Sequence, residues 1–177
     1  MTKTKVFIIV DMQNDFITGQ LANPEGQALV GNLKAEIEKK KSEGYKILFT
    51  QDTHDTHYLE SQEGKYLPIS HCIEGTEGWE IIPELRAYTN DRNVLLKKAF
   101  GSPEIGQWIT EAAGGEPEEI IIAGVCTDIC VISNAMILKA YFPEVPIKVM
   151  GKLCAGITKD GHERALEAMK PCQIEVI

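Results

Sequence analysis

The chain has 177 residues, of which 44% are hydrophobic and 25% are charged, the balance of a globular protein with a sizeable core. Its 26 acidic and 18 basic residues leave a formal net charge of -8, which argues against nucleic acid or an anionic membrane surface as a partner. The five cysteines lack the spacing of a disulfide scaffold, and the first apolar run is too short for a signal peptide or a membrane span. We therefore expect reduced thiols in a cytoplasmic protein.

Short β-branched runs alternate with longer segments of helical spacing along the whole chain. Six runs predict strands, at residues 6–10, 46–50, 94–96, 119–123, 147–150 and 174–177. Four apolar sets predict helices: Leu29, Leu33 and Ile37; Ile105, Trp108 and Ile109; Ile129, Ile132, Met136 and Ala140; and Ala165, Leu166 and Met169. Strands that are apolar throughout are buried on both faces. The pattern predicts an α/β fold in one domain over residues 1–177, a three-layer α-β-α sandwich with a mostly parallel sheet of about six strands.

Polar residues with reactive groups follow four of the predicted strands. Asp11 ends the first strand, Asp52 follows the second, Lys97 ends the third and Cys130 follows the fourth. In open α/β sheets, ligands bind beyond the carboxyl ends of the strands, so we expect these groups at one edge. The long segment 51–93 carries three of the four histidines, and long loops in compact domains are often functional.

Cys130 closes the stretch GVCTDIC, between a predicted strand and a predicted helix. Thr127 or Asp128 is a suitable N-cap for a helix running to about Tyr141, which would place Cys130 in its first turn. The positive end of the helix dipole would lower the pKa of the thiol, and free N–H groups could stabilise an oxyanion. The alternative is a buried cysteine with a purely structural role.

Asp11 and Lys97 are the expected helpers of that thiol. Asp11 directly follows a fully apolar strand, where a partly desolvated carboxylate can accept the thiol proton and return it to a leaving amine. Lys97 ends VLLK, where its ammonium would keep Asp11 ionised, with Lys98 as the competing lysine. Each residue also has an ordinary interpretation, a loop-capping aspartate and a solvated lysine.

The long segment also contains candidate metal ligands. Asp52, His54 and His71 offer one carboxylate and two imidazoles, which suit zinc or a similar divalent ion with open coordination positions. Glu63 is a candidate fourth ligand, and His57 and Cys72 are possible substitutes. The remaining histidine, His162, is expected near the start of a helix without a partner.

Five motifs in this order resemble the cysteine hydrolases of the isochorismatase-like superfamily, with the nearest likeness to nicotinamidases: VDMQNDF, QDTHDTH, ISHC, VLLKKAFGS and AGVCTDIC. The resemblance runs from about Val6 to the C-terminus. It implies a triad of Asp11, Lys97 and Cys130, with Lys97 chosen over Lys98 because it stands three residues before Phe100. It also implies a homo-oligomer.

The resemblance further implies a cis peptide between Val125 and Cys126, which would direct the N–H groups of Cys126 and Cys130 at the oxyanion. A metal on Asp52, His54 and His71 would hold the ring nitrogen of the substrate. The expected substrate contacts are Phe16 and Val125. Nicotinamidases often place a tryptophan just before the later histidine, whereas here the stretch reads LPISHC and the nearest aromatic is Tyr66.

The expected activity is cysteine-dependent hydrolysis of a small amide, nicotinamide to nicotinate and ammonia, through a thioester. Two alternatives stay open at this point. One is a related amidase that acts on another small amide or a ureido or carbamoyl compound. The other is a hydrolase whose metal activates water, with Cys130 in a structural role.

Overall fold

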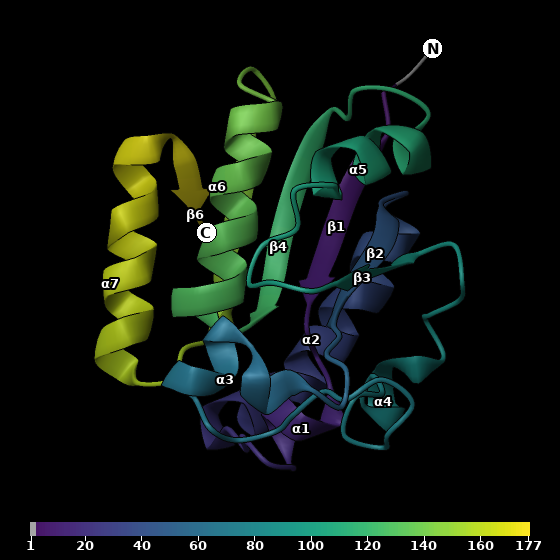
Figure 1. Ribbon diagram of the computed structural model, residues 1–177. Coiled ribbons are helices and arrows are strands. Elements are labelled where there is room, and N and C mark those ends of the chain that lie inside the picture. The colour runs from purple at the N-terminus through teal and green to yellow at the C-terminus, as the bar shows by residue number, and fades with distance from the viewer. Residues whose placement is uncertain (1–2) are drawn as a thin grey trace.

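The computed structural model describes residues 3–177, which form three layers around a six-stranded sheet (Figure 1). All strand pairs are parallel, in the order β3-β2-β1-β4-β5-β6. The strands are β1 (Lys5–Val10), β2 (Lys46–Asp52), β3 (Val94–Lys97), β4 (Glu119–Val125), β5 (Ile147–Ala155) and β6 (Ile174–Val176). The predicted sandwich is confirmed, and all six predicted strands are present.

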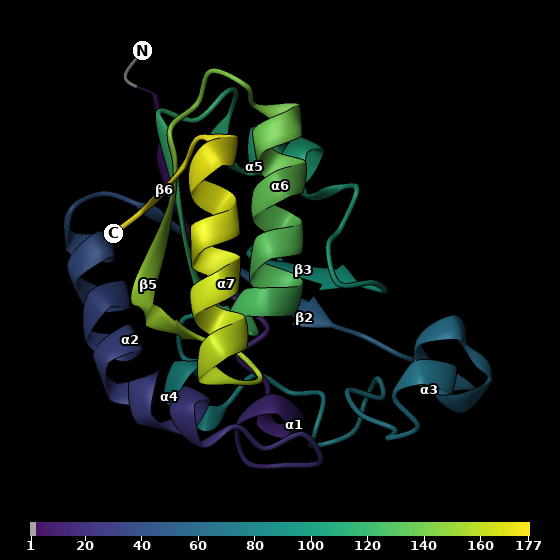
Figure 2. The ribbon, with the colours of Figure 1, turned by 90° about the vertical axis from the view of Figure 1, so that its left-hand side faces the viewer.

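Helices cover both faces of the sheet. The helices are α1 (Asn14–Ile17), α2 (Pro24–Ser42), α3 (Gln62–Tyr66), α4 (Pro83–Arg86), α5 (Ile105–Ala113), α6 (Ile132–Tyr141) and α7 (Lys159–Met169), with short helical turns η1 (Tyr58–Glu60), η2 (Thr127–Val131) and η3 (Lys170–Cys172). Helices α5, α6 and α7 lie on one face and α2 on the other (Figures 1 and 2). None of the helices in residues 3–177 is long and apolar enough to cross a membrane.

The central strands are apolar because they are buried on both sides. All of the last five residues of β1 are fully buried, and Ile120, Ile122 and Ala123 of β4 are equally inaccessible. The buried side chains of the sheet and of the helices on its two faces form one continuous hydrophobic cluster. Burial of this surface is the main favourable contribution to folding.

Helix α2 shows how local sequence sets an element. Asn23 is its N-cap, and its side chain accepts a hydrogen bond from the Gly26 N–H at 3.0 Å. The predicted apolar face of Leu29, Leu33 and Ile37 is buried against the sheet. The interpretation of these three residues from their spacing is therefore confirmed.

The buried face of α6 differs from the prediction. The spacing of Ile129, Ile132, Met136 and Ala140 predicts that face, but the structure buries Val131, Asn134, Ala135 and Leu138 instead. The reason is twofold. Residues 127–131 form a π-helical turn, which rotates the helix after it, and α6 packs between α5 and α7, so that its flanks are half-buried.

The carboxyl ends of the strands meet α1, α3 and α4 and the long segment after β2 (Figure 1). At this edge β4 approaches β1 very closely at Gly124, which has φ +121°. A Cβ atom there would lie 2.2 Å from the carbonyl oxygen of Val10, so only glycine fits. This close approach brings the segment after β4 next to Asp11.

Candidate active site

Asp11 is completely buried directly after β1. Its backbone has φ 49°, a left-handed conformation that non-glycine residues adopt rarely and that is often found at functional sites. Thr50 on β2 donates a hydrogen bond from Oγ1 to Asp11 Oδ1 at 2.7 Å, and its carbonyl accepts from the Asp11 N–H at 3.2 Å. Thr50 on β2 therefore fixes Asp11 Oδ1 by a hydrogen bond. Asp11 Oδ2 remains available for a different contact.

Lys97, the last residue of β3, is the centre of this site. Its Nζ lies 2.7 Å from Asp11 Oδ2 and 2.8 Å from Asp52 Oδ1, and it donates to the Ala99 carbonyl at 3.1 Å. The competing Lys98 is exposed, because successive side chains of a strand point to opposite faces. The ammonium of Lys97 is thus held between two carboxylates, one at the end of the adjacent strand β2 and one directly after β1.

Cys130 contacts Lys97, the central residue of this cluster. The Lys97 ammonium donates to Cys130 Sγ at 3.5 Å, so sulfur, ammonium and carboxylate gather around one point. Cys130 does not lie in the first turn of an α-helix, as the sequence suggests, but in the π-helical turn η2. Neither Thr127 nor Asp128 is the N-cap; Cys126 takes that position, without a side-chain hydrogen bond.

Burial dominates the electrostatics of the three groups. Burial raises the pKa of the Cys130 thiol well above its ordinary value, and the charge of Asp11 adds to this effect. The predicted lowering of that pKa by a helix dipole is therefore wrong for the free protein. Burial also raises the pKa of Asp11, although Lys97 opposes the shift. Burial alone would lower the pKa of Lys97, but Asp11, Cys130 and Asp52 outweigh it and raise it.

These shifts describe a neutral thiol beside a buried carboxylate and a fixed ammonium. A carboxylate with a raised pKa is a stronger base, and the nearby ammonium favours a thiolate once the proton has moved. Burial raises the pKa of the neighbouring Cys126 thiol to about 12, and within residues 3–177 the ammonium of Lys97 donates a hydrogen bond to Cys130 and not to Cys126. Cys130 is therefore the cysteine equipped for proton transfer.

The peptide bond between Val125 and Cys126 is cis. Within residues 3–177, the Cys126 N–H donates no hydrogen bond. Its carbonyl oxygen accepts from the N–H groups of Ile129 and Val131, at 3.1 and 3.0 Å, which closes the turn that carries Cys130.

Asp52, His54 and His71 form a cluster beside Lys97. One ligand atom from each lies within 4.8 Å of the others, and all three side chains are largely buried. His54 Nε2 has no hydrogen-bond partner within residues 3–177, although Asp52 Oδ2 is 2.9 Å away. A buried carboxylate and two imidazoles facing one point are a donor set that fits a divalent metal ion.

Neighbouring groups fix the orientation of both imidazoles. His71 Nδ1 is 2.8 Å from the Ile69 carbonyl, which directs Nε2 into the cluster. The buried ring of Tyr58 packs edge-on against both histidines, with ring centroids 4.7 Å from His54 and 4.9 Å from His71. The Tyr58 hydroxyl donates to the Leu67 carbonyl at 2.9 Å, which ties the segment that carries Glu63 to the same ring.

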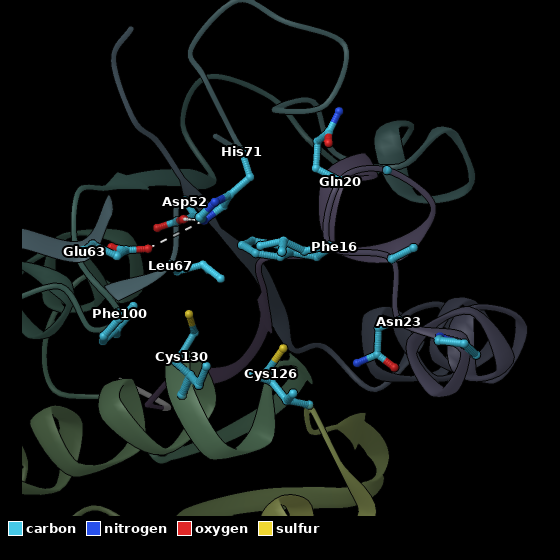
Figure 3. A pocket seen from close by; sticks show the side chains of 16 residues that line it. Phe16, Gln20, Asn23, Asp52, Glu63, Leu67, His71, Phe100, Cys126 and Cys130 are labelled. Carbon is cyan, nitrogen blue, oxygen red and sulfur yellow. Dashed lines mark ion pairs between the residues drawn. The ribbon is translucent and has the colours of Figure 1, made fainter. Parts of the chain in front are cut away.

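The other candidate ligands fall into two groups. Glu63 Oε1 lies 3.6 Å from Nε2 of both His54 and His71, and therefore borders the cluster (Figure 3). The exposed His57 ring pairs with Glu60 at 3.3 Å. Cys72 is buried, and its N–H donates to Asp15 Oδ2 at 2.8 Å. Neither His57 nor Cys72 belongs to the cluster.

A cavity of about 520 Å³ opens onto these groups (Figure 3). Its lining includes Asp52, Glu63, His71, Cys126 and Cys130, with apolar side chains of Phe16, Leu21, Leu67, Phe100, Ile129 and Ile157. The sulfur atoms of Cys126 and Cys130 both point into it (Figure 3). Phe16 is part of the wall, whereas Val125 is fully buried in the core and does not line the cavity.

Several contacts of this site have no signal in the sequence motifs. Thr50 stands near the end of β2, after its apolar residues, and its contact with Asp11 depends on the pairing of β1 with β2. His162 is near the start of α7 as predicted, but it has a partner: its Nδ1 lies 2.7 Å from Thr127 Oγ1. Both pairs join residues more than 30 positions apart.

The model of the isochorismatase domain matches residues 5–177. The chain belongs to the isochorismatase family. The relatives of this isochorismatase-family chain include the nicotinamidase of Escherichia coli (strain K12), which is 26% identical, with 91% of this chain and 87% of the relative covered.

Two solved structures are similar over nearly the full length of this family member. The pyrazinamidase of Pyrococcus horikoshii in complex with zinc has a TM-score of 0.80 and 26% identity, with 98% of each chain covered. The pyrazinamidase/nicotinamidase of Streptococcus mutans UA159 has a TM-score of 0.83 and 26% identity, with 98% of this chain and 100% of that chain covered.

Proposed function

We propose that this protein is an amidohydrolase that converts nicotinamide to nicotinate and ammonia through a thioester on Cys130. The observation that carries the proposal is the convergence of Asp11, Lys97 and Cys130, where one ammonium lies 2.7 Å from the carboxylate and 3.5 Å from the sulfur. The similarity to nicotinamidases and pyrazinamidases over almost the whole chain supports the same activity.

The first step is activation of the nucleophile. Asp11 accepts the proton of the Cys130 thiol, which the raised pKa of its buried carboxyl favours. The Lys97 ammonium stabilises the thiolate that results. The sulfur attacks the amide carbon, a C–S bond forms, and the carbonyl electron pair moves onto oxygen.

Attack of the sulfur gives a tetrahedral intermediate, which breaks down in the next step. The N–H groups of Cys126 and Cys130 donate to the oxyanion; loss of one such donor typically lowers the rate by about 10²–10³. Asp11 then gives its proton to the amide nitrogen as the C–N bond breaks, and ammonia leaves. The product of this half-reaction is a thioester between the acyl group and Cys130.

Water completes the cycle. Asp11, again ionised, takes a proton from a water molecule, whose oxygen attacks the thioester carbon. The C–S bond breaks, Asp11 returns its proton to the sulfur, and the product leaves as nicotinic acid, which loses its proton to solvent and becomes nicotinate. The thiol proton and the proton taken from water therefore both pass through one carboxylate, which its position beside Lys97 and Thr50 allows.

Asp52, His54 and His71 are the residues that hold a divalent metal in this proposal, and zinc is the ion we expect. Glu63 is a further ligand on the open side of the cluster. When bound, the ion supplies a Lewis-acidic position for the ring nitrogen of the substrate. The protein's own residues then orient the amide towards Cys130.

The cavity wall fits a neutral aromatic amide. Phe16, Leu67 and Phe100 provide apolar surface for a ring. Nicotinamidases often place a tryptophan just before the later histidine; the nearest aromatic before His71 here is Tyr66, which is 83% exposed, so Phe16 is the aromatic contact we propose. The expected contact of Val125 with the substrate would involve only its backbone, because its side chain is buried in the core. No lysine or arginine is among the lining residues described, so the apolar part of the wall offers an anionic group no salt-bridge partner.

A panel of small amides tests the proposal. Ammonia release is measured with nicotinamide, pyrazinamide, a ureido compound and a carbamoyl compound, with and without a chelator. We expect release from the two aromatic amides, and intact mass measurement of an acyl adduct on Cys130. Ammonia release without any adduct would favour a metal-activated water, and release from the ureido compound alone would favour the related amidase.

Three broader expectations remain predictions. These are one domain over residues 1–177, a homo-oligomer and a cytoplasmic location. Light scattering of the purified protein measures the subunit number directly, and a monomer at micromolar concentration would contradict the second expectation.

A further inference from the structure

His162 contacts the segment that carries the nucleophile. Its Nδ1 lies 2.7 Å from Oγ1 of Thr127, and Thr127 is completely buried. The hydroxyl and the imidazole can exchange donor and acceptor roles, depending on the tautomer. A half-buried histidine therefore provides the hydrogen-bond partner of a buried hydroxyl that has no other within residues 3–177.

Thr127 has a critical place in the backbone. It directly follows Cys126, and it is the first residue of the turn that delivers Cys130 to Lys97. The Cys126 carbonyl accepts two hydrogen bonds from within that turn. The dihedral angles at Thr127 therefore contribute to the direction of the Cys126 N–H relative to the Cys130 sulfur.

Hydrogen bonding and close packing at the start of α7 hold the backbone of His162. The His162 N–H donates to the Thr158 carbonyl at 2.9 Å, and Gly156 packs so closely that a Cβ there would lie 2.8 Å from His162 N. Asp128 makes a second link, because its Oδ1 accepts from the Ile157 N–H at 3.1 Å. Thr127 and Asp128 belong to the turn η2 (Thr127–Val131), which carries Cys130 and is called the nucleophile turn below. The side chains of these two residues thus join that turn to residues 157–162.

We propose that His162 is a positioning residue, which acts through Thr127 to orient the oxyanion donor at Cys126 and the sulfur of Cys130. The inference rests on the proposed function. Without the imidazole, the buried Thr127 hydroxyl loses its partner, and the turn adopts other arrangements. A displacement of about 1 Å at a reacting group can lower a rate by about 10²-fold.

The experiment compares His162→Ala, Thr127→Val and their double variant in zinc-loaded protein with nicotinamide as substrate. We expect each single variant to lower kcat by about 10- to 100-fold, with KM changed less than about 3-fold. The double variant loses no more than the worse single variant, because both remove the same hydrogen bond. Thr127→Ser keeps the hydroxyl and retains most of the activity.

Thr158→Ala is the matched control. Thr158 Oγ1 accepts from the Gly161 N–H at 3.0 Å and caps the same helix, but within residues 3–177 this side chain makes no hydrogen bond to residues 127–131. We expect its Tm to fall by about 2–4 °C with kcat unchanged. An unchanged kcat in His162→Ala, multiplicative losses in the double variant, or an equal loss in Thr158→Ala would overturn the inference.

A second measurement needs no substrate. Iodoacetamide alkylation of Cys130, followed by peptide mass mapping, reports how the turn holds the sulfur. We expect His162→Ala and Thr127→Val to accelerate it at least about threefold, since the buried turn opens more often, and Thr158→Ala to leave it unchanged. If the wild-type protein hydrolyses none of the amides, the proposed function fails, and the alkylation rate of Cys130 alone tests the role of His162. Equal alkylation rates in all variants would reject that role.

Discussion

The ammonium of Lys97 lies 2.7 Å from Asp11 Oδ2, and neither side chain is exposed to solvent. The same ammonium lies 2.8 Å from Asp52 Oδ1, so one positive charge faces two buried carboxylates. Buried charges are stable only when paired, and the cluster has an excess of negative charge. A cation held by Asp52 and the two histidines would neutralise the remaining negative charge. Because the ammonium of Lys97 contacts both Asp52 and Cys130, it links the candidate metal site to the proposed nucleophile.

Removal of the Lys97 charge should destabilise the protein. Lys97→Ala leaves Asp11 and Asp52 facing each other without a counter-charge, and breaking a buried pair in this way typically costs about 3–5 kcal/mol. We expect this loss in the free energy of unfolding, measured by urea denaturation of metal-free protein. The exposed Lys98→Ala is the control and should change stability by less than about 0.5 kcal/mol. Equal effects of the two variants would contradict the buried ion-pair arrangement.

The pH dependence of kcat/KM should have an acid limb set by Asp11. Only the ionised carboxylate can accept the thiol proton, and burial raises its pKa above the ordinary 3.8, so activity rises as pH increases through that raised value. The Thr50 hydroxyl stabilises the ionised form. Thr50→Val should therefore move the limb to higher pH, measured with metal occupancy held constant. An unmoved limb would mean that another group controls it.

Substitution of Cys130, the proposed nucleophile, should separate catalysis from folding and metal binding. Cys130→Ala removes the sulfur and should reduce ammonia release by at least about 10⁴-fold, because no thioester can form. Zinc content and Tm should stay close to those of the wild-type protein. Cys126→Ala is the matched control, since its sulfur points into the same cavity but lacks the contact with Lys97. Retained turnover in Cys130→Ala would end the covalent mechanism.

Metal affinity should depend on the buried histidines and not on the exposed one. His71→Ala removes a proposed ligand whose Nε2 faces Asp52 Oδ2 at 3.7 Å, and should weaken zinc binding at least about 100-fold in a chelator competition assay. His57→Ala should leave it unchanged, because its ring pairs with Glu60 at the surface. Tight binding in His71→Ala, or a loss in His57→Ala, would contradict the assigned ligand set.

The cavity wall should control substrate affinity. Phe16→Ala removes the aromatic face that we propose for the ring, and should raise KM by about 10-fold with a smaller change in kcat. Tyr66→Ala is the comparison, because Tyr66 is 83% exposed and does not line the cavity. A KM that responds to Tyr66 and not to Phe16 would place the ring elsewhere.

The layered fold could be predicted from the sequence because its strands are apolar without interruption, and such runs are stable only between two layers of helices. Helix α6 shows the limit of the same reasoning. Its apolar residues suggest one face, but the π-helical turn before it and the neighbouring α5 and α7 bury Ala135 and Leu138 instead. Periodicity describes an isolated helix, and packing on three sides changes which side chains are covered.

The sequence by itself determined which reactive side chains follow the strands, since Asp11, Asp52, Lys97 and Cys130 stand where apolar runs stop. Only the tertiary structure decided how they act on one another. Burial raises the pKa of the Cys130 thiol, against the expected effect of a helix dipole, and Thr127 meets His162 across 35 residues. The physical reason is that desolvation and hydrogen bonding depend on what surrounds a group in space, which residue order alone does not specify.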